Sequence, residues 1–298
     1  MSEPQQPTLQ DWLLLAALAL LWGTAFLFIR FSLDSQPPVA VSTVRLALGA
    51  IVLLGFAHYR GRQMPPLNDV RWVHFALLGF FGNALPFFLI PLGQTEISSA
   101  LAGILVAVMP LATVVLAYFF AGESMTKWKL IGFLTGFAGV VVLIGPTALG
   151  NLGGADTLFQ LVVLAAGLSY AVNAVLTRRT PKTPASVLAA GALSCAAVMS
   201  LPFGIWAAWQ NELPATTLGW SSLVWLGIGP TAVATVIFMR IIERAGAGFL
   251  SLVNYIVPVI ALLTGLAFGE SVSWNAYLGL AIILGGIALA RRSPAGPR

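Results

Sequence analysis

Apolar residues occur along this chain in long runs, and short polar breaks separate one run from the next. A helix needs about 20 mostly apolar residues to cross a bilayer, because lipid cannot satisfy exposed backbone N–H and C=O groups. Ten runs meet this requirement. They predict membrane-spanning helices at residues 12–31, 38–57, 72–92, 98–120, 129–144, 158–177, 186–209, 218–239, 248–268 and 274–290.

The composition agrees with this pattern. Of the 298 residues, 58% are hydrophobic and 8% are charged, and the mean hydropathy is +0.92. Soluble domains carry about 25% charged residues. The apolar runs extend over nearly the whole chain and leave no hydrophilic block for a separate water-facing domain. The predicted fold class is therefore an all-α integral membrane protein.

Lysine and arginine fall almost entirely on one side of the predicted membrane. The second, fourth, sixth and eighth breaks and the C-terminus hold nearly all of them, whereas the other breaks hold Arg30 and several acids. Positive residues resist translocation and remain cytoplasmic. Both termini are therefore expected in the cytoplasm.

The chain contains an internal repeat. A shift of 148 residues places Trp22 on Tyr170, Arg30 on Arg178, Asn83 on Thr231 and Pro110 on Pro258, and a shift of 147 places Glu123 on Glu270. Five helices form each half, so the second half must cross the membrane in the opposite sense. The predicted organisation is an N-terminal tail at 1–11, a first repeat at 12–146, a connecting loop at 147–157, a second inverted repeat at 158–290 and a C-terminal tail at 291–298.

These features resemble a known family. The double five-helix repeat, the Trp22-Gly23-Thr24 start, the embedded Arg45 and the two Gly-Glu pairs at 122–123 and 269–270 are similar to EamA-type transporters of the drug/metabolite transporter superfamily, closest to the YddG-type aromatic amino acid exporters. The resemblance covers residues 12–290. It implies a bacterial inner-membrane exporter of amino acids or related metabolites with a central cavity. It specifies the substrate poorly, because one scaffold serves many solutes.

Arg45 lies inside the second apolar run, where a charge costs several kcal/mol unless it is paired or hydrated. Two interpretations are open: Arg45 binds helix-terminal carbonyls and holds the bundle together, or it orients a carboxylate near the outer mouth.

Prolines at comparable depth in the two halves are candidate hinges. Pro110 and Pro258 are predicted within helices, where proline removes an intrahelical hydrogen bond, and Pro86 and Pro230 extend the pattern. A simple packing kink is the alternative for each of them. Glu123 and Glu270 follow glycine at helix ends on opposite membrane faces. They either gate those ends or are solvated interfacial charges.

Polar and aromatic side chains at midplane depth are the candidates for substrate binding. An amide or hydroxyl in hydrocarbon needs a partner, so each should face the bundle interior, either as a bond between helices or as a substrate contact. Together they predict a neutral, aromatic, sparsely polar pocket, which suits an amphipathic solute. The residues are Trp22, Thr24, Asn83, Tyr170, Asn173, Thr231, Asn254 and Tyr255, with Ser169 beside them.

Several kinds of chemistry have no support in the sequence. There is no Walker A loop, no histidine or carboxylate cluster with metal spacing and no second thiol for Cys195, so no cofactor or metal is expected. The basic residues form no dense face for nucleic acid, and no obligate protein partner is evident. No acid lies deep in a span, which favours facilitated export or coupling through groups at the mouths.

The leading hypothesis is a transporter that exports amino acids, with aromatic or bulky apolar ones preferred, by alternating access around a midplane cavity. Its partners would be a small-molecule substrate and the lipid bilayer. The alternatives are an exporter of other metabolites or xenobiotics in the same superfamily and an intramembrane enzyme, for which no convergent nucleophile and base are present.

Overall fold

The computed structural model describes residues 7–145, 155–210, 212 and 214–292, and in these residues every regular element is helical. The elements, in chain order, are α1 (Leu9–Leu33), α2 (Pro38–Tyr59), α3 (Arg71–Gly79), η1 (Phe80–Ala84), α4 (Leu85–Gly93), α5 (Ser99–Val106), α6 (Met109–Ala121), α7 (Lys127–Ile144), α9 (Ala155–Thr177), α10 (Ala185–Trp209), α11 (Thr217–Leu226), η2 (Gly227–Val233), α12 (Ala234–Leu250), α13 (Val253–Ala267) and α14 (Trp274–Ala290).

These elements make up the predicted number of spans. Among the described residues, eight helical stretches are long and apolar enough to cross a membrane, and Val253–Ala267 and Trp274–Ala290 are two shorter apolar helices. The third, fourth and eighth spans are each built from more than one element, such as α3, η1 and α4. The predicted fold class, ten transmembrane helices in two inverted repeats, is confirmed.

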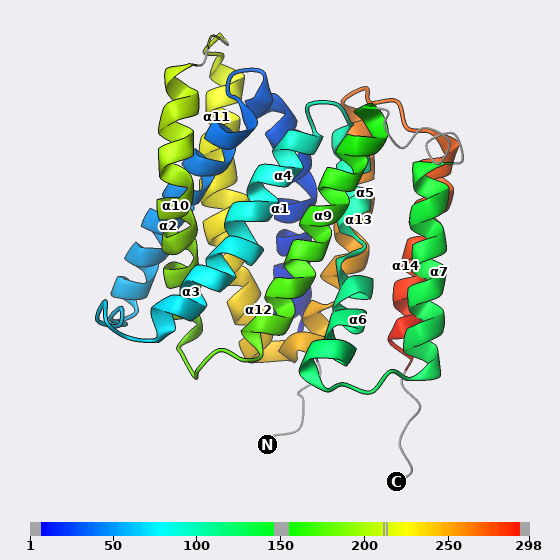
Figure 1. Cartoon of the computed structure of the whole chain (residues 1–298), viewed down its shortest axis with the longest axis horizontal. Helices are drawn as coiled ribbons and strands as arrows, with labels where there is room; N and C mark the ends of the chain where they lie inside the picture. Colours follow the sequence, from blue (N-terminus) through cyan, green and yellow to red (C-terminus); the bar gives the residue numbers. More distant parts are fainter. Residues whose placement is uncertain (1–6, 146–154, 211, 213, 293–298) are drawn as a thin grey trace.

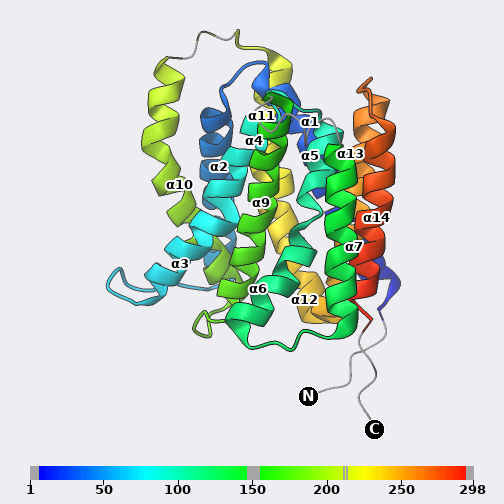
Figure 2. The same ribbon diagram turned by 45° about the vertical axis from the view of Figure 1, so that its right-hand side comes forward.

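The helices run roughly parallel and antiparallel in one bundle (Figure 1). The start of α1 and the end of α14 lie at the same end of the bundle, here called the terminus end (Figures 1 and 2). The fifth helix of each half packs against that of the other, since α7 and α14 lie side by side in both views.

Glycine makes the contact between α7 and α14 very close. A Cβ atom added to Gly286 would lie 2.5 Å from the backbone nitrogen of Gly136, and one added to Gly139 would lie 2.8 Å from that of Ile283. Small residues allow this backbone approach in membrane helices, where van der Waals packing and not water exclusion drives association.

Several predicted boundaries need correction. α1 begins at Leu9 and not at residue 12, because Thr8 and Asp11 form a reciprocal capping box that satisfies the first backbone N–H groups. α9 begins at Ala155, inside the predicted connecting loop at 147–157. The greater part of that loop, residues 147–154, and residues 293–298 of the C-terminal tail lie outside the described residues.

The fourth and ninth spans differ from the continuous helices that were predicted. The fourth span breaks at Ala107 and Val108, and Pro110 lies in the first turn of α6, where a missing N–H removes no intrahelical bond. Pro258 lies inside α13. The last turn of α12 already belongs to the ninth span, because Gly246 has φ +80°, a left-handed conformation that turns the chain between two helices.

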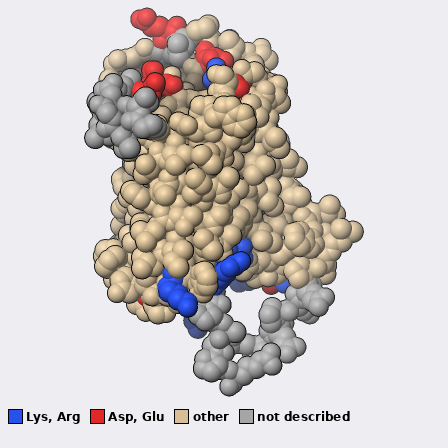
Figure 3. Space-filling model, turned by 90° about the vertical axis from the view of Figure 1, so that its right-hand side faces the viewer, with Lys and Arg blue, Asp and Glu red and all other residues tan. Residues whose placement is uncertain are grey.

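Charge separates along the bundle axis. Lysine and arginine gather near the terminus end, and aspartate and glutamate gather at the opposite end, with a small basic patch among them (Figure 3). The wide band between the two ends carries neither kind of residue on the face shown. This band matches the hydrocarbon region that the apolar runs predict.

Candidate functional site

The third span of each half contains a π-helical segment. These segments are η1 and η2, and a shift of 148 residues places the η1 range, 80–84, within the η2 range, 227–233. π-Helical turns within α-helices are rare and frequently occur at functional sites. Their recurrence at equivalent positions of both halves marks the middle of the bundle as the candidate site.

Proline explains the irregular backbone of η2. Pro230 has no N–H to donate to the carbonyl four residues earlier, that of Leu226. The Thr231 hydroxyl donates to this carbonyl instead, at 2.8 Å. Thr231 was predicted at the substrate site, and its first role in the structure is to complete the backbone bonding of η2.

The same logic applies to η1. Leu85 donates its N–H to the carbonyl of Phe80, five residues earlier, and the next donor in that register would be Pro86, which has none. The Phe81 carbonyl therefore accepts a bond of 2.7 Å from the hydroxyl of Ser169 on α9. Pro86 lies at the start of α4, where the hydrogen-bond register changes from π-helical back to α-helical.

Helix α1, the first helix of the first half, also contacts η2. Trp22 on α1 donates its indole N–H to the Pro230 carbonyl at 3.1 Å, and its ring lies 5.9 Å from that of Phe238. Thus α1 of the first half holds η2 of the second, and α9 of the second half holds η1 of the first. In each half, therefore, the first helix bonds to the π-helical segment of the other half at the candidate site.

Replacing Trp22 with phenylalanine should weaken this contact between the halves. The change keeps an aromatic ring beside Phe238 but removes the N–H donor, and one lost hydrogen bond costs about 1 kcal/mol. The expected result is a lower unfolding midpoint of the purified protein in detergent. Trp12→Phe is the matched control, because Trp12 is half-exposed and packs edge-to-face against Phe249 at a helix end. An equal loss in both variants would contradict the role given to the Trp22 N–H.

Arg45 joins α2 of the first half to η2. Its Nε donates to the Thr231 hydroxyl oxygen at 2.8 Å, and its guanidinium carbon lies 3.8 Å from the centre of the Phe87 ring. Arg45 is 6% exposed. Phe87 belongs to a buried cluster with Leu46 and Leu193, against which Tyr170 also packs. Through Thr231 and this cluster, the predicted residues Arg45, Tyr170 and Thr231 come together.

Other predicted residues have local roles. The Thr24 hydroxyl donates to the Leu20 carbonyl of its own helix at 2.6 Å. The Asn83 amide donates to the Leu78 carbonyl of its own span at 3.5 Å. Asn173 lies against Gly82 of η1, and its side-chain oxygen is buried without a hydrogen-bond partner in the described residues. This unpartnered acceptor is enclosed beside η1 in the described conformation.

Tyr255 lies closer to the terminus end than the prediction of midplane depth implies. It precedes the middle of α13, and the guanidinium of Arg291, which follows α14, lies 5.5 Å from the centre of its ring. Asn254 is the adjacent residue and is partly buried. Tyr255 packs against the same large buried cluster as Tyr170.

Glu270 joins the two halves at the end of the bundle opposite the termini. Its carboxylate accepts bonds from the backbone N–H groups of Ser99 at 3.0 Å and Ala100 at 2.9 Å, which begin α5. Arg30 lies 3.6 Å from the same carboxylate, and the Glu270 side chain is 4% exposed. A carboxylate at a helix N-terminus is stabilised by free N–H groups and the helix dipole. The interpretation of Glu270 as a solvated interfacial charge is therefore wrong.

Glu123 is the equivalent residue at the terminus end, and its surroundings differ. It forms ion pairs with Lys129 at 3.0 Å and with Arg178, and its side chain is 38% exposed. The hydrogen bond from Lys129, followed by that from Arg178, lowers the pKa of Glu123, and partial burial opposes this. Arg30 and Arg178 are repeat equivalents, so the Arg30–Glu270 and Arg178–Glu123 pairs form a symmetric set, of which only the first caps a helix.

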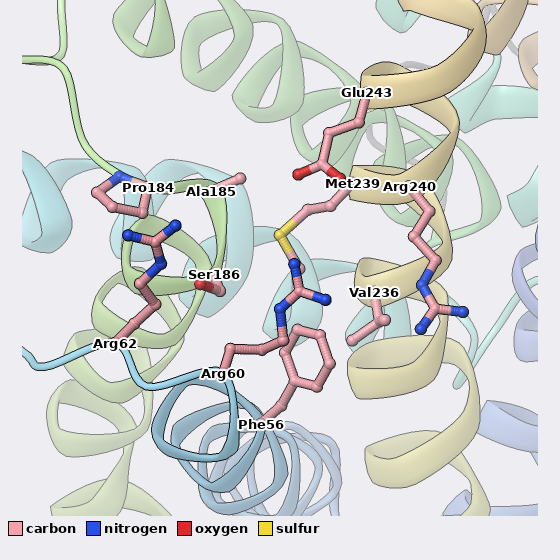
Figure 4. Close-up of a pocket in the computed structure, with 10 residues that line it drawn as sticks. All are labelled: Phe56, Arg60, Arg62, Pro184, Ala185, Ser186, Val236, Met239, Arg240 and Glu243. Carbon is pink, nitrogen blue, oxygen red and sulfur yellow. The ribbon is translucent and has the colours of Figure 1, made fainter.

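An opening lies at the terminus end between α2, α10 and α12. It has a volume of about 190 Å³, and Arg60 and Glu243 extend into it from opposite walls (Figure 4). Its lining residues are Phe56, Arg60, Arg62, Pro184, Ala185, Ser186, Val236, Met239, Arg240 and Glu243. Both halves contribute walls to it. A second hollow of about 300 Å³ lies at the opposite end, beside Arg30 and Glu270, and is also lined by both halves. Opposite the termini, the Ser35 and Thr216 hydroxyls join α1 to the start of α11 at 2.7 Å.

Sequence reasoning did not find every residue of this site. Phe87 is one of many aromatics in apolar runs, and no local signal distinguishes it as the partner of Arg45. Arg244 is bound to Asp11 at 2.7 Å, which ties the start of α1 to α12. The Thr8-x-x-Asp11 capping signature was present in the sequence and could have placed Asp11 within the helix. No group of three or more potential metal ligands occurs among the described residues.

Two interlocked inverted halves with irregular helices at mid-membrane define a membrane transporter of the inverted-repeat class. The EamA-like transporter family model matches residues 11–145 and again residues 157–292, and the chain therefore belongs to the EamA-like transporter family. This membership confirms the resemblance to the drug/metabolite transporter superfamily and the expectation that the protein is a transporter and not an enzyme.

Similar proteins match along nearly their whole length. The chain is 27% identical to the inner membrane transporter YedA of Escherichia coli K12, over 92% of this chain and 88% of YedA. It is 28% identical to the aromatic amino acid exporter YddG of Ancylobacter novellus, over 91% and 93%, and 27% identical to a probable terminal-alkyne amino-acid exporter of Streptantibioticus cattleyicolor, over 93% and 92%. A solved structure with 26% identity superposes with a TM-score of 0.67 and covers 95% of this chain and 97% of its own.

Proposed function

We propose that this transporter exports amino acids, with aromatic or bulky apolar ones preferred, or similar small metabolites, by alternating access around the site between η1 and η2. The observation that carries the proposal is the matched pair of π-helical segments, each held by the first helix of the opposite half. Irregular backbone at membrane depth is tolerated where it lies within protein or lines a cavity.

The chemistry of the site supports an amphipathic solute. Trp22, Phe87 and Tyr170 supply rings, and Arg45 is the charged residue among the side chains that contact η2. A phosphate carrier would be expected to present several cations at this depth. Two of the similar proteins are named as exporters of amino acids, and one is named as an inner membrane transporter.

The charge distribution supports an orientation with the terminus end in the cytoplasm. We assign the terminus end to the cytoplasm of a bacterial inner membrane, because lysine and arginine concentrate there. The opening lined by Arg60 and Glu243 then faces the cytoplasm, and Glu270 joins the two halves at the outer end, beside a hollow of about 300 Å³. An exporter would take up its solute through the cytoplasmic opening.

The internal repeat suggests how the contacts at the two ends of the bundle change between the two conformations. Glu270 caps α5 at Ser99 and Ala100, and a shift of 148 residues carries these positions to Ala247 and Gly248, at the start of the ninth span. In the opposite conformation Glu123 would cap that start, and Glu270 would leave α5. Arg178 would stay with Glu123 as Arg30 stays with Glu270 here.

Counterflow in proteoliposomes tests the proposed function. Vesicles loaded with unlabelled phenylalanine should accumulate labelled phenylalanine or tryptophan transiently, and vesicles loaded with a sugar should not. Trp22→Ala and Tyr170→Ala should each reduce this flux, because both remove rings from the site. Activity with other solutes and none with any amino acid would instead favour the alternative of an exporter of other metabolites or xenobiotics.

The ionisation of Glu123 gives a prediction about pH. Its pKa lies below the ordinary value of 4.5, so its ion pairs contribute stability above that value and lose it only as pH falls through the lowered pKa. Between pH 5 and 8 Glu123 stays ionised. Flux through Glu123→Gln should be altered in rate but should follow the same pH profile as wild type over this window. A pH dependence that disappears in Glu123→Gln would contradict this assignment.

A further inference from the structure

Arg45 is a buried cation without a counterion in the described residues. The ion pairs of the described chain involve Arg30, Arg71, Lys129, Arg178 and Arg244, and none of them involves Arg45. Its neutral partners are the Thr231 hydroxyl and the face of the Phe87 ring. A cation at this depth that lacks a carboxylate partner is costly, and that cost falls if an anion binds beside it.

The guanidinium is held so that one edge stays free. Nε is the nitrogen that bonds to protein, and the Phe87 ring covers one face. The two terminal nitrogens have no hydrogen-bond partner in the described residues, yet they are not among the fully enclosed, unpartnered side-chain atoms. They are therefore not fully enclosed, although the residue is only 6% exposed. The terminal nitrogens of a fixed guanidinium present a fork that matches the two oxygens of a carboxylate.

The repeat shows that the fold itself does not require this charge. The position equivalent to Arg45 in the second half is Leu193, which is buried at 2% exposure in an apolar cluster. The acids near the two ends of the bundle, Glu123 and Glu270, by contrast, occur in both halves. A charge that appears in one half alone, beside the equivalent irregular segments, points to a ligand and not to shared architecture.

We propose that the terminal nitrogens of Arg45 bind the carboxylate of the transported solute, whose apolar side group lies towards Phe87 and Tyr170. The inference rests on the proposed function and narrows it to carboxylate-bearing solutes. Thr231 fixes the Nε side of the guanidinium and also bonds to the Leu226 carbonyl that Pro230 leaves free. Arg45 is thus connected to the irregular backbone of η2 through a single hydroxyl.

The test uses four related probes on purified protein in detergent. Phenylalanine and phenylacetate carry a carboxylate, whereas phenylalaninamide and phenethylamine have the same ring and no carboxylate. Calorimetry should give affinities for the first two that are at least about ten-fold higher than for the last two, a difference of about 1.4 kcal/mol. Arg45→Gln should lose the preference while binding of phenethylamine stays unchanged, and Arg45→Lys should retain part of it. Arg71→Gln, which removes an arginine charge that pairs with Asp69 away from this cluster, is the matched control and should retain the preference.

The outcomes separate the two proposals. Equal wild-type affinity for phenylalanine and phenylalaninamide overturns the carboxylate assignment even if counterflow shows amino acid export. Retention of the preference in a folded Arg45→Gln protein also overturns it. If no amino acid is exported but phenylacetate binds in an Arg45-dependent manner, the carboxylate site stands and the amino acid proposal fails. If Arg45→Gln does not fold, the wild-type comparison of the four probes decides.

Discussion

Glu270→Ala is expected to reduce counterflow by at least about ten-fold and to leave the outer end of the protein more open. The substitution removes a buried acceptor from two backbone N–H groups at the start of α5 and leaves Arg30 without its carboxylate. Bonds to a charged group contribute about 1.5 to 3 kcal/mol each, and 1.4 kcal/mol corresponds to ten-fold in an equilibrium. The conformation in which Glu270 holds the two halves together at this end should therefore lose most of its population.

Labelling of a buried cysteine measures this opening. Ile97 is 6% exposed beside Glu270, and Ile97→Cys in a Cys195→Ser background should react faster with a membrane-impermeant maleimide when Glu270 is alanine. Glu96→Ala is the matched control, because Glu96 is exposed on the same face and has no ion pair in the described chain. Equal labelling in the two variants would show that Glu270 does not hold the two halves together at the outer end.

Gly286→Leu should abolish folding, whereas Gly285→Leu should be tolerated. A Cβ on Gly286 would meet the backbone of Gly136 at 2.5 Å, and backbone cannot move aside as a flexible side chain can. A Cβ on Gly285 would meet nothing within 4 Å. The α7–α14 contact depends on this approach, so the leucine at 286 separates the fifth helices of the two halves.

Fluorescence-detected size exclusion of the two variants checks this prediction. Gly285→Leu should elute as wild type, and Gly286→Leu should aggregate or fail to accumulate in membranes. The pair is closely matched, since both changes add the same apolar side chain to neighbouring positions of one helix. A monodisperse Gly286→Leu protein would contradict the interlocked arrangement of α7 and α14.

Hydropathy and the internal repeat predicted the architecture well. The ten spans follow from the length of the apolar runs. The offset of 148 residues aligns Asn83 with Thr231, and these residues lie in η1 and η2. Lipid gives every membrane helix nearly the same apolar surroundings, so the length of an apolar run is enough to predict a span. What run length cannot show is a local change of backbone register, and η1 and η2 were therefore not predicted.

The candidate site was predicted only in part. Arg45, Trp22 and Thr231 stood out because charge, indole and hydroxyl groups are conspicuous in apolar runs. Phe87 and the α5 backbone that binds Glu270 gave no such signal, because phenylalanine and free N–H groups are common to every span. Pairings across the two halves depend on tertiary packing, and residue type alone does not specify them.

The most direct test of alternating access is whether the two ends of the bundle move in opposite directions. Spin labels at positions 62 and 243 report on the terminus end, and labels at positions 95 and 271 report on the outer end, each pair joining the two halves. Addition of saturating phenylalanine should shorten the first distance and lengthen the second in a fraction of the same population, as measured by pulsed electron resonance on labelled variants that still show counterflow. Distances that both shorten, both lengthen or do not respond at all would contradict a transporter whose two inverted halves open one end as they close the other.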